Sequence, residues 1–425
     1  MNKIEVIQIE KVGTKICVHF KVDGDVKRYF QTDIFVSEYI NDISAVPDSI
    51  AVIPFVCNVL PIIWLTDSFL NLPVLDQSFY NGLEQIKEGY CKMYPNMLFR
   101  GILEVGNIVD NKINIERSKR NCTVLFSGGI DAFSTLLNHI NERPILLTIW
   151  GADIKLNDTQ GWNNVYGHTR KVAQSLGLEY GYVKANFREF IAVDRLSVLV
   201  KESGDEWWHG FQHGIGLIGL VAPIAYLKKL YCVYIASSYA VNNVTCASHP
   251  TIDNYVAFAG CNTIHDQYMY TRQQKVGDIC AYARRVGQYP LLRVCWESSG
   301  GKNCGYCEKC LRSVYGLIVE GEEPNNYGFH IEPDKIRLSI NKIIQTYKFP
   351  IHNRCYWKEI QQRYRGNKEN ILPSYRQACL WLDEFDFEVF HSKKYKLKYF
   401  FFKLKSVLSH WDTLSYVIKT RLRIT

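Results

Sequence analysis

The 425-residue sequence lacks any run of about 18 or more uncharged apolar residues, the length that a membrane-spanning helix requires. Its start, Met1–Glu5, also lacks the long apolar stretch of a secretory signal peptide. Cysteine is not scarce, with fourteen residues, but without an export signal these predict reduced thiols, some of them metal ligands. We therefore expect a cytoplasmic protein.

The chain has no excess charge outside one segment. Residues 391–425 contain nine basic residues and one acidic residue, so they account for the whole net charge of +8 and the remainder is neutral. Nucleic acid is thus not an expected partner, because such partners need basic residues spread over a contact face. Apolar residues from Phe400 to Leu422 recur at three- and four-residue steps and predict an amphipathic helix. This helix either docks on the body or makes a peripheral membrane contact.

Residues 1–118 predict a β-rich accessory domain without visible chemistry. Two β-branched and aromatic runs, Lys15–Val22 and Val26–Gln31, flank Asp23-Gly24, a dipeptide typical of a tight hairpin. The apolar segments Ile50–Val56 and Ile62–Leu65 contain or adjoin prolines, which break helices and confine strands to sheet edges.

From residue 119 to about 330 strands and helices alternate. This pattern predicts an α/β fold with a parallel, doubly wound sheet, in which ligands bind beyond the carboxyl ends of the strands. Residues 331–425 predict a helical C-terminal region. The expected strands are Cys122–Phe126, Ile145–Ile149, Tyr180–Lys184 and Tyr231–Ser237, with a long helix at Trp207–Lys229 before the last of them.

The loop after the first of these strands is the first segment with specific chemistry. Gly128 and Gly129 let the backbone approach a ligand closely, and the following helix presents its free N–H groups. Ser127 and Ser134 offer hydroxyl contacts to oxygen anions, and Asp131 is suited to a magnesium ion or to a loop amide. A strand–helix turn that needs glycine only for its geometry is the alternative.

The string Ser127-Gly128-Gly129-Ile130-Asp131 resembles the Ser-Gly-Gly-x-Asp-Ser loop of the PP-loop ATP pyrophosphatases. The resemblance implies an adenine nucleotide α-hydrolase-like fold, ATP and Mg²⁺, cleavage between the α and β phosphates, and an adenylated substrate oxygen. It also implies that Ser127, Gly128, Gly129, Ile130, Asp131 and Ser134 bind ATP. The family loop ends in serine where this chain has Ala132.

Four cysteines have the spacing of a metal site: Cys295-x8-Cys304-x2-Cys307-x2-Cys310. Two overlapping C-x2-C steps put three thiolates on one turn, and Cys295 supplies the fourth. A closed four-thiolate set suits a structural zinc ion, since no position remains for substrate. An iron–sulfur cluster and four free thiols are the alternatives.

With the upstream loop, this cysteine pattern resembles the 7-cyano-7-deazaguanine synthase family over residues 119–320. That family is zinc-containing and converts a 7-deazaguanine carboxylate to a nitrile with ammonia and ATP. The resemblance implies an ATP-dependent ligase or amidotransferase that forms AMP and pyrophosphate and transfers nitrogen. A small-molecule acid and an amine donor are the expected partners, and a protein acceptor is possible.

Residues 237–275 are dense in polar side chains. His265 and Asp266 are candidates for proton transfer, and Arg272 and Lys275, one helical turn apart, for neutralising phosphate charge. With Asp131 they form the predicted catalytic set; a solvated loop followed by an amphipathic helix is the alternative. His249, near Asp253, is a weaker candidate. Trp207-Trp208-His209 through His213 either line the adenine side of the nucleotide or, as is more usual for aromatic residues on a long buried helix, belong to the core.

Two other functions remain open. One is PP-loop transfer of sulfur or nitrogen onto RNA or a surface-polysaccharide sugar, against which the neutral body argues. The other is a non-catalytic nucleotide-binding module, which Ala132 favours.

Overall fold

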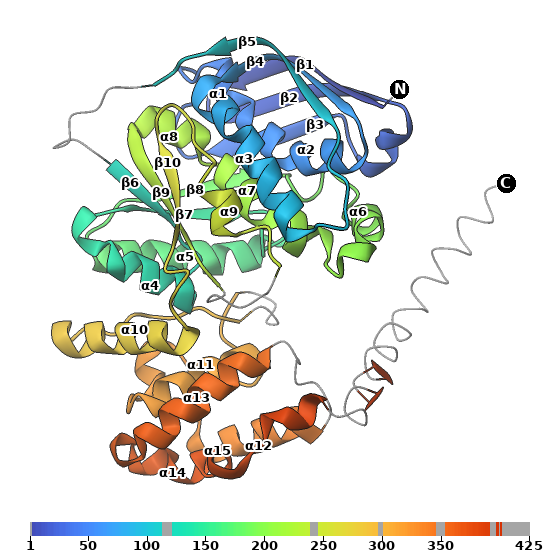
Figure 1. Ribbon diagram of the computed structural model, residues 1–425. Coiled ribbons are helices and arrows are strands. Elements are labelled where there is room, and N and C mark those ends of the chain that lie inside the picture. Colours follow the sequence, from blue (N-terminus) through green and yellow to red (C-terminus); the bar gives the residue numbers. More distant parts are fainter. Residues whose placement is uncertain are drawn as a thin grey trace. The chain divides into compact units, whose positions relative to one another are not determined.

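The computed structural model describes residues 2–112, 121–238, 245–295, 301–345 and 353–391, together with residues 397, 398, 400 and 401. The expected α/β class is confirmed: a ten-stranded, mostly parallel sheet has the order β10-β9-β6-β7-β8-β3-β2-β1-β4-β5 (Figure 1).

The chain forms two compact units, and their boundary differs from the expected ones. The first unit contains the chain up to Tyr270 together with the short stretch at Lys302, and the second begins at Thr271. Strands from residues 1–118 and from residues 121–266 belong to one sheet, so no boundary between compact units falls at residue 118. The sequence predicted that the ATP-binding domain continues to residue 330, whereas the second compact unit already begins at Thr271.

Five parallel strands form one half of the sheet, in the order β10-β9-β6-β7-β8. All four strands predicted after residue 119 are present, and β10 is an additional one. Most of their apolar residues are buried, as expected for strands covered on both faces, while Ile264 of β10, the strand at the sheet edge, is exposed. The strands are β6 (Asn121–Leu125), β7 (Ile145–Trp150), β8 (Tyr180–Ala185), β9 (Leu230–Ala236) and β10 (Asn262–Asp266).

The helices between these strands cover both faces. From β6 the chain moves through α4 (Ile130–Asn138) to β7 and through α5 (Thr159–Ser175) to β8, then returns to place β9 on the other side of β6. Because such crossovers are right-handed, α4 and α5 lie on one face and α7 (His213–Gly219) and α8 (Ala222–Lys228) on the other (Figure 1). This arrangement is compatible with a doubly wound sheet.

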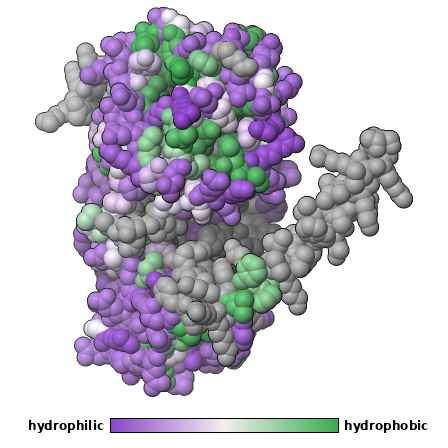
Figure 2. Space-filling model, turned by 45° about the vertical axis from the view of Figure 1, so that its right-hand side comes forward, coloured by the Kyte–Doolittle hydropathy of each residue, from purple (hydrophilic) through white to green (hydrophobic). Residues whose placement is uncertain are grey.

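The expected long helix at Trp207–Lys229 is divided. A π-helical turn, Trp208–Gln212, precedes α7, and α8 follows α7 after a short break. Among the described residues, Trp208–Lys228 is the one helical stretch that is long and apolar enough to cross a membrane, but 78% of its apolar 18-residue window is buried, as in a core helix. The face shown in Figure 2 is mainly hydrophilic, with apolar side chains gathered in several places on the first unit.

The N-terminal strands form the other half of the sheet. β1 (Lys3–Val12), β2 (Lys15–Asp23) and β3 (Ile34–Tyr39) are antiparallel, and β3 pairs with β8. β4 (Phe69–Asp76) and β5 (Ile102–Val109) continue in parallel from β1.

The predicted hairpin at Asp23-Gly24 is wrong. The hairpin lies instead at Gly13, whose φ of +56° supplies the left-handed conformation of the turn between β1 and β2. Gly24 is also left-handed, but it leads into a 3₁₀ helix, Asp25–Tyr29, in place of a strand.

The apolar segments at residues 50–65 are helical, contrary to the expectation from their prolines. They form α1 (Asp48–Ala51) and α2 (Ile53–Leu65), and α3 (Gln77–Met93) follows β4. Pro54 lies in the first turn of α2, where no intrahelical N–H bond is lost, while Pro61 is inside the helix. Every residue from Ile53 to Trp64 is buried, so tertiary packing outweighs the local cost of Pro61.

The second unit is helical, as predicted for the C-terminal region. Its core contains Tyr315, Trp357 and Trp381, whose ring centroids lie 5.5–5.7 Å apart. The predicted amphipathic tail helix at 391–425 falls largely outside the described residues. The helices are α10 (Arg272–Val286), α11 (Glu308–Val319), α12 (Pro333–Gln345), α13 (Arg354–Gly366), α14 (Pro373–Cys379) and α15 (Trp381–Glu384).

Candidate functional site

The Ser127–Asp131 loop lies at the point where the strand order reverses. It follows β6, whose neighbours β7 and β9 are reached by connections on opposite faces of the sheet. In open parallel sheets the crevice beyond the carboxyl strand ends at such a point is where ligands bind. The structure therefore places the loop at the position that the sequence predicted.

The geometry of the loop suits an anion. Gly128 has a φ of +80°, and Gly129 is the N-cap of α4 without a side-chain hydrogen bond to the first turn. Gly129 N–H donates to Ser127 Oγ at 3.4 Å, and Asp131 is in the first turn of the helix. The N–H groups that begin α4 are thus not satisfied by a capping side chain, as at helix termini that bind phosphate.

Two buried hydroxyls lie in the second turn of α4. Ser134 is 1% exposed and Thr135 is fully buried, and neither hydroxyl has a hydrogen-bond partner among the described residues. Ala132, at the position where the resembled family has serine, is buried as well. Ser127 is exposed, whereas the side chain of Ile130 is in the core, so Ile130 can offer a ligand only its backbone.

The side chains of His265 and Asp266 contact different partners. His265 Nδ1 lies 2.8 Å from Asp253 Oδ2, and both side chains are almost fully buried. Ser248 Oγ donates to the same carboxylate oxygen at 2.8 Å. His249, for which Asp253 was the nearby acid, instead places Nε2 2.9 Å from the Tyr268 hydroxyl.

Asp266 contacts a different histidine. Its Oδ1 lies 3.2 Å from His139 Nε2, and His139 Nδ1 lies 2.6 Å from Glu142 Oε1. The ring of His139 also stacks on Tyr234 at 3.6 Å between centroids. Burial lowers the pKa of His139, but the hydrogen bonds to Asp266 and Glu142 outweigh it and raise the pKa overall.

Arg272 and Lys275 belong to the second unit and are described within it. Arg272 lies over the ring of Tyr356, with 4.9 Å to the centroid, and its charge acts on the carboxylate of Glu359. Lys275 is 1% exposed. Arg272 is thus packed against its own helical unit, and Lys275 is buried.

A second polar group in the first unit was not predicted from the sequence. Cys246 follows β9 and lies beside two histidines, His209 of the π-helical turn and His213 of α7. Asp205 accepts a hydrogen bond from His209, with Nδ1 and Oδ1 2.7 Å apart. The available signal was the four-residue step from His209 to His213, which puts two imidazoles on one helical face.

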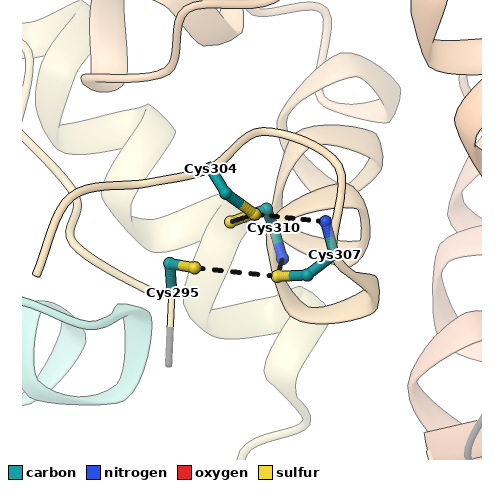
Figure 3. A group of neighbouring side chains, drawn as sticks. All are labelled: Cys295, Cys304, Cys307 and Cys310. Carbon is teal, nitrogen blue, oxygen red and sulfur yellow. Dashed lines mark hydrogen bonds between the residues drawn. The ribbon is translucent and has the colours of Figure 1, made fainter. Parts of the chain in front are cut away.

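The four predicted cysteines form one group in the second unit (Figure 3). Their sulfurs all lie within 4.8 Å of one another, with 3.8 Å between Cys295 and Cys307 and 3.9 Å between Cys304 and Cys310. Ligand sulfurs about 2.3 Å from a tetrahedral zinc ion lie about 3.8 Å apart, so the spacing fits one ion. The group could therefore bind a metal such as zinc.

The local backbone positions these thiols. Gly305 has a φ of +82°, and the N–H groups of Cys307 and Cys310 donate to the sulfurs of Cys304 and Cys307 at 3.3 and 3.4 Å. A hydrogen bond from Cys310 lowers the pKa of Cys307 to about 6, while the same bond raises the pKa of Cys310. Asn303 Oδ1 accepts from the Cys295 N–H and holds the separate ligand in place.

The fold and these groups define an α/β protein with a glycine loop and an uncapped helix N-terminus at the sheet's switch point, and a separate four-cysteine group. Comparison with known proteins gives no match: no family model fits the chain, and no curated protein or solved structure matches it.

Proposed function

We propose that the protein is an ATP-dependent ligase or amidotransferase that forms AMP and pyrophosphate. In this reaction a carboxylate or amide oxygen of a small-molecule acid attacks the α-phosphorus of ATP, and an amine then displaces AMP. The observation that carries the proposal is the Ser127–Asp131 loop, which leads from the central strand β6 into an uncapped helix N-terminus.

The residues of the loop have separate roles in this proposal. The N–H groups that begin α4 hold the β and γ phosphates and stabilise the charge that accumulates on departing pyrophosphate. The hydroxyl of Ser127 adds a contact to a phosphate oxygen, and Asp131 holds Mg²⁺ against the nucleotide. Adenylation helps because AMP leaves far more readily than oxide or hydroxide.

The missing hydroxyl at Ala132 has a local substitute. Ser134 and Thr135 carry buried hydroxyls that have no partner among the described residues, and both follow the loop within one and a half helical turns. Buried polar groups are normally satisfied, so these two hydroxyls are candidates for ligand contacts.

The four-cysteine group is proposed to hold a structural zinc ion. Four thiolates complete a tetrahedral shell and leave no position for substrate. Sulfurs within 4.8 Å of one another suit a single ion better than an iron–sulfur cluster, whose several irons and sulfides would lie between them. Zinc would then stabilise the turn that begins α11.

The test is product analysis with the full chain, ATP, Mg²⁺ and a panel of small carboxylic acids that includes a 7-deazaguanine carboxylate. We expect AMP and pyrophosphate to appear only when an acid is present. Formation of ADP and phosphate instead would contradict the PP-loop chemistry.

A second candidate function, nucleotide binding without turnover, is favoured by Ala132 alone. It predicts that ATP binds with Mg²⁺ but that no acid provokes release of pyrophosphate. The same experiment, combined with a binding measurement by calorimetry, separates the two.

A further inference from the structure

Cys246 lies in a setting that differs from that of the other buried cysteines in the first unit. Its sulfur is 3.9 Å from His213 Nδ1, and His209 also contacts it through a hydrogen bond. Cys57 and Cys261, by contrast, have no such partners, and burial raises the pKa of each thiol.

The histidine beside Cys246 is held by a carboxylate. Asp205 Oδ1 lies 2.7 Å from His209 Nδ1, and Asp205 Oδ2 accepts from Thr245 Oγ1 at 2.6 Å and from the Tyr94 hydroxyl at 2.9 Å. Since Nδ1 faces the carboxylate, the other ring nitrogen is left for the thiol. This order of thiol, imidazole and carboxylate is the arrangement that activates a cysteine nucleophile.

The electrostatics agree with this geometry. Burial would raise the pKa of Cys246, but the hydrogen bonds from His209 and His213 outweigh it and lower the pKa to about 6. The hydrogen bond to Asp205 raises the pKa of His209. At neutral pH the pair is therefore a thiolate beside an imidazolium.

The group is partly exposed and does not resemble a metal site. Cys246 is 4% exposed, and the side chain of His209 is 36% exposed, so the pair meets solvent through the histidine. Among the described residues, the one group of His, Cys, Asp and Glu side chains spaced to hold a metal ion is the four-cysteine cluster. A nucleophilic role is thus favoured over metal binding.

The strand order relates this group to the edge of the sheet at which the Ser127–Asp131 loop lies. Cys246 follows β9, which is hydrogen-bonded to β6, the strand that leads into Ser127. His213 is close enough to Asp153, which follows β7, for that carboxylate to raise its pKa. Strands β7 and β9 flank β6 and run parallel to it, so the chain leaves all three at the same edge of the sheet.

We propose that Cys246 is a nucleophile that accepts an activated acyl group as a thioester, with His209, oriented by Asp205, moving the proton. The thiolate of Cys246 forms a C–S bond to the acyl carbon as the C–O bond to the leaving group breaks, and the leaving group departs with that electron pair and with the proton of the His209 imidazolium. An amine then attacks the thioester, the now neutral His209 takes the amine's proton, and the C–S bond breaks to regenerate the thiolate beside the imidazolium. In the cell this step rests on the proposed function, since AMP would be the leaving group of the acyl adenylate.

The first test is alkylation of the full chain by iodoacetamide, followed residue by residue by mass spectrometry. At about pH 5.5 a thiol of pKa about 6 is roughly a quarter ionised and an ordinary thiol about 0.1%, so even with its lower intrinsic nucleophilicity Cys246 should react about tenfold faster than an ordinary thiol. The exposed Cys91 is the internal reference. No labelling of Cys246, or labelling slower than that of Cys91, would overturn the proposal.

The pH profile of alkylation must be assigned to the right groups. The titratable side chains that act on Cys246 or its partner imidazoles come from several elements: His209 of the π-helical turn, His213 of α7, Tyr90 of α3, Tyr94 just after α3, Asp253 of α9 (Pro250–Asp253), and the loop residues Asp153 and Asp205. We expect a half-maximal rate near pH 6, set mainly by His209, and a move toward the free-thiol value of about 8.5 in His209→Gln. An unchanged profile in His209→Gln would contradict the assigned role of His209.

The second test uses p-nitrophenyl acetate, an activated acyl probe that needs no ATP. A burst of p-nitrophenolate equal to one acyl group per chain, with acetyl on Cys246, supports the proposal; Cys91→Ser should keep the burst and Cys246→Ala should lose it. Absence of the burst in the native protein would overturn it. If the burst is present but no acid provokes pyrophosphate release, the acyl-accepting site is supported and the proposed function is refuted. If Cys246→Ala releases pyrophosphate and forms the amide at native rates, the proposed function is supported and the thioester is refuted.

Discussion

A step of one residue along β10 separates two histidine pairs. His265 faces Asp253 on one side of the strand, and Asp266 faces His139 on the other. The sequence paired His265 with Asp266 because they are neighbours, but adjacent strand residues point to opposite faces. The acidic partner of His265 is therefore not its neighbour in the sequence but Asp253, which is twelve positions away.

At the residue scale we predict that Gly128→Ala abolishes ATP binding, while Gly13→Ala does not. Both glycines have positive φ, at +80° and +56°, so each alanine should cost about 1 kcal/mol of unfolding free energy through backbone strain. Only Gly128 lies in the proposed phosphate loop. The measurements are denaturant unfolding and calorimetric titration with Mg·ATP; equal affinity in the two variants would refute the role of the loop.

At the scale of elements, the junction between β3 and β8 joins the two halves of the sheet. Its regular pairing covers three residues of each strand, from Ser37 to Tyr39 and from Val183 to Ala185. Beyond it Asn186 continues the contact: its Oδ1 accepts from the Val36 N–H at 2.9 Å and its Nδ2 donates to the Ile34 carbonyl at 3.1 Å. A side chain thus completes the hydrogen bonding of β3 where strand pairing ends.

We predict that Asn186→Ala lowers the unfolding free energy by about 1–2 kcal/mol, since two partly buried backbone groups lose their partner. Asn121→Ala is the matched control, because Asn121 is exposed and makes one bond to the Lys228 carbonyl, so its loss should stay within about 0.5 kcal/mol. Urea unfolding measures both. Equal losses would show that Asn186 does not support the junction.

The sequence predicted the strands after residue 121 correctly but did not predict the helix α2. The strands after residue 121 were recognisable because short β-branched and apolar runs are separated by helical periodicity. α2 was not, since its prolines argued against a helix and its continuous apolar surface shows no amphipathic period. Tertiary burial of that whole surface decided its structure.

At the scale of the whole molecule, two compact units have separate cores, and the proposed metal belongs to one of them. Zinc binding to four thiolates contributes on the order of 10–16 kcal/mol, comparable with the whole stability of a typical domain of about 5–15 kcal/mol. The second unit should therefore depend on the metal, and the first should not.

We predict that chelation, or Cys307→Ser, lowers the thermal transition of the second unit and leaves that of the first unit unchanged. Cys355→Ser, a partly exposed cysteine of the second unit outside the cluster, should retain both metal and stability. Calorimetry and elemental analysis provide the readouts. Native zinc content in Cys307→Ser, or iron with inorganic sulfide in the native protein, would contradict the assignment.

The sequence alone determined the features that depend on local spacing. The C-x2-C steps predicted the four-cysteine group, and the Ser127–Asp131 string at a strand–helix boundary predicted the loop at the carboxyl edge, because both geometries span only a few residues. Only the tertiary structure decided which distant side chains meet: Asp253 with His265, His139 with Asp266, and Cys246 with His209. These contacts depend on strand order and on helix packing across the sheet, which no short segment encodes.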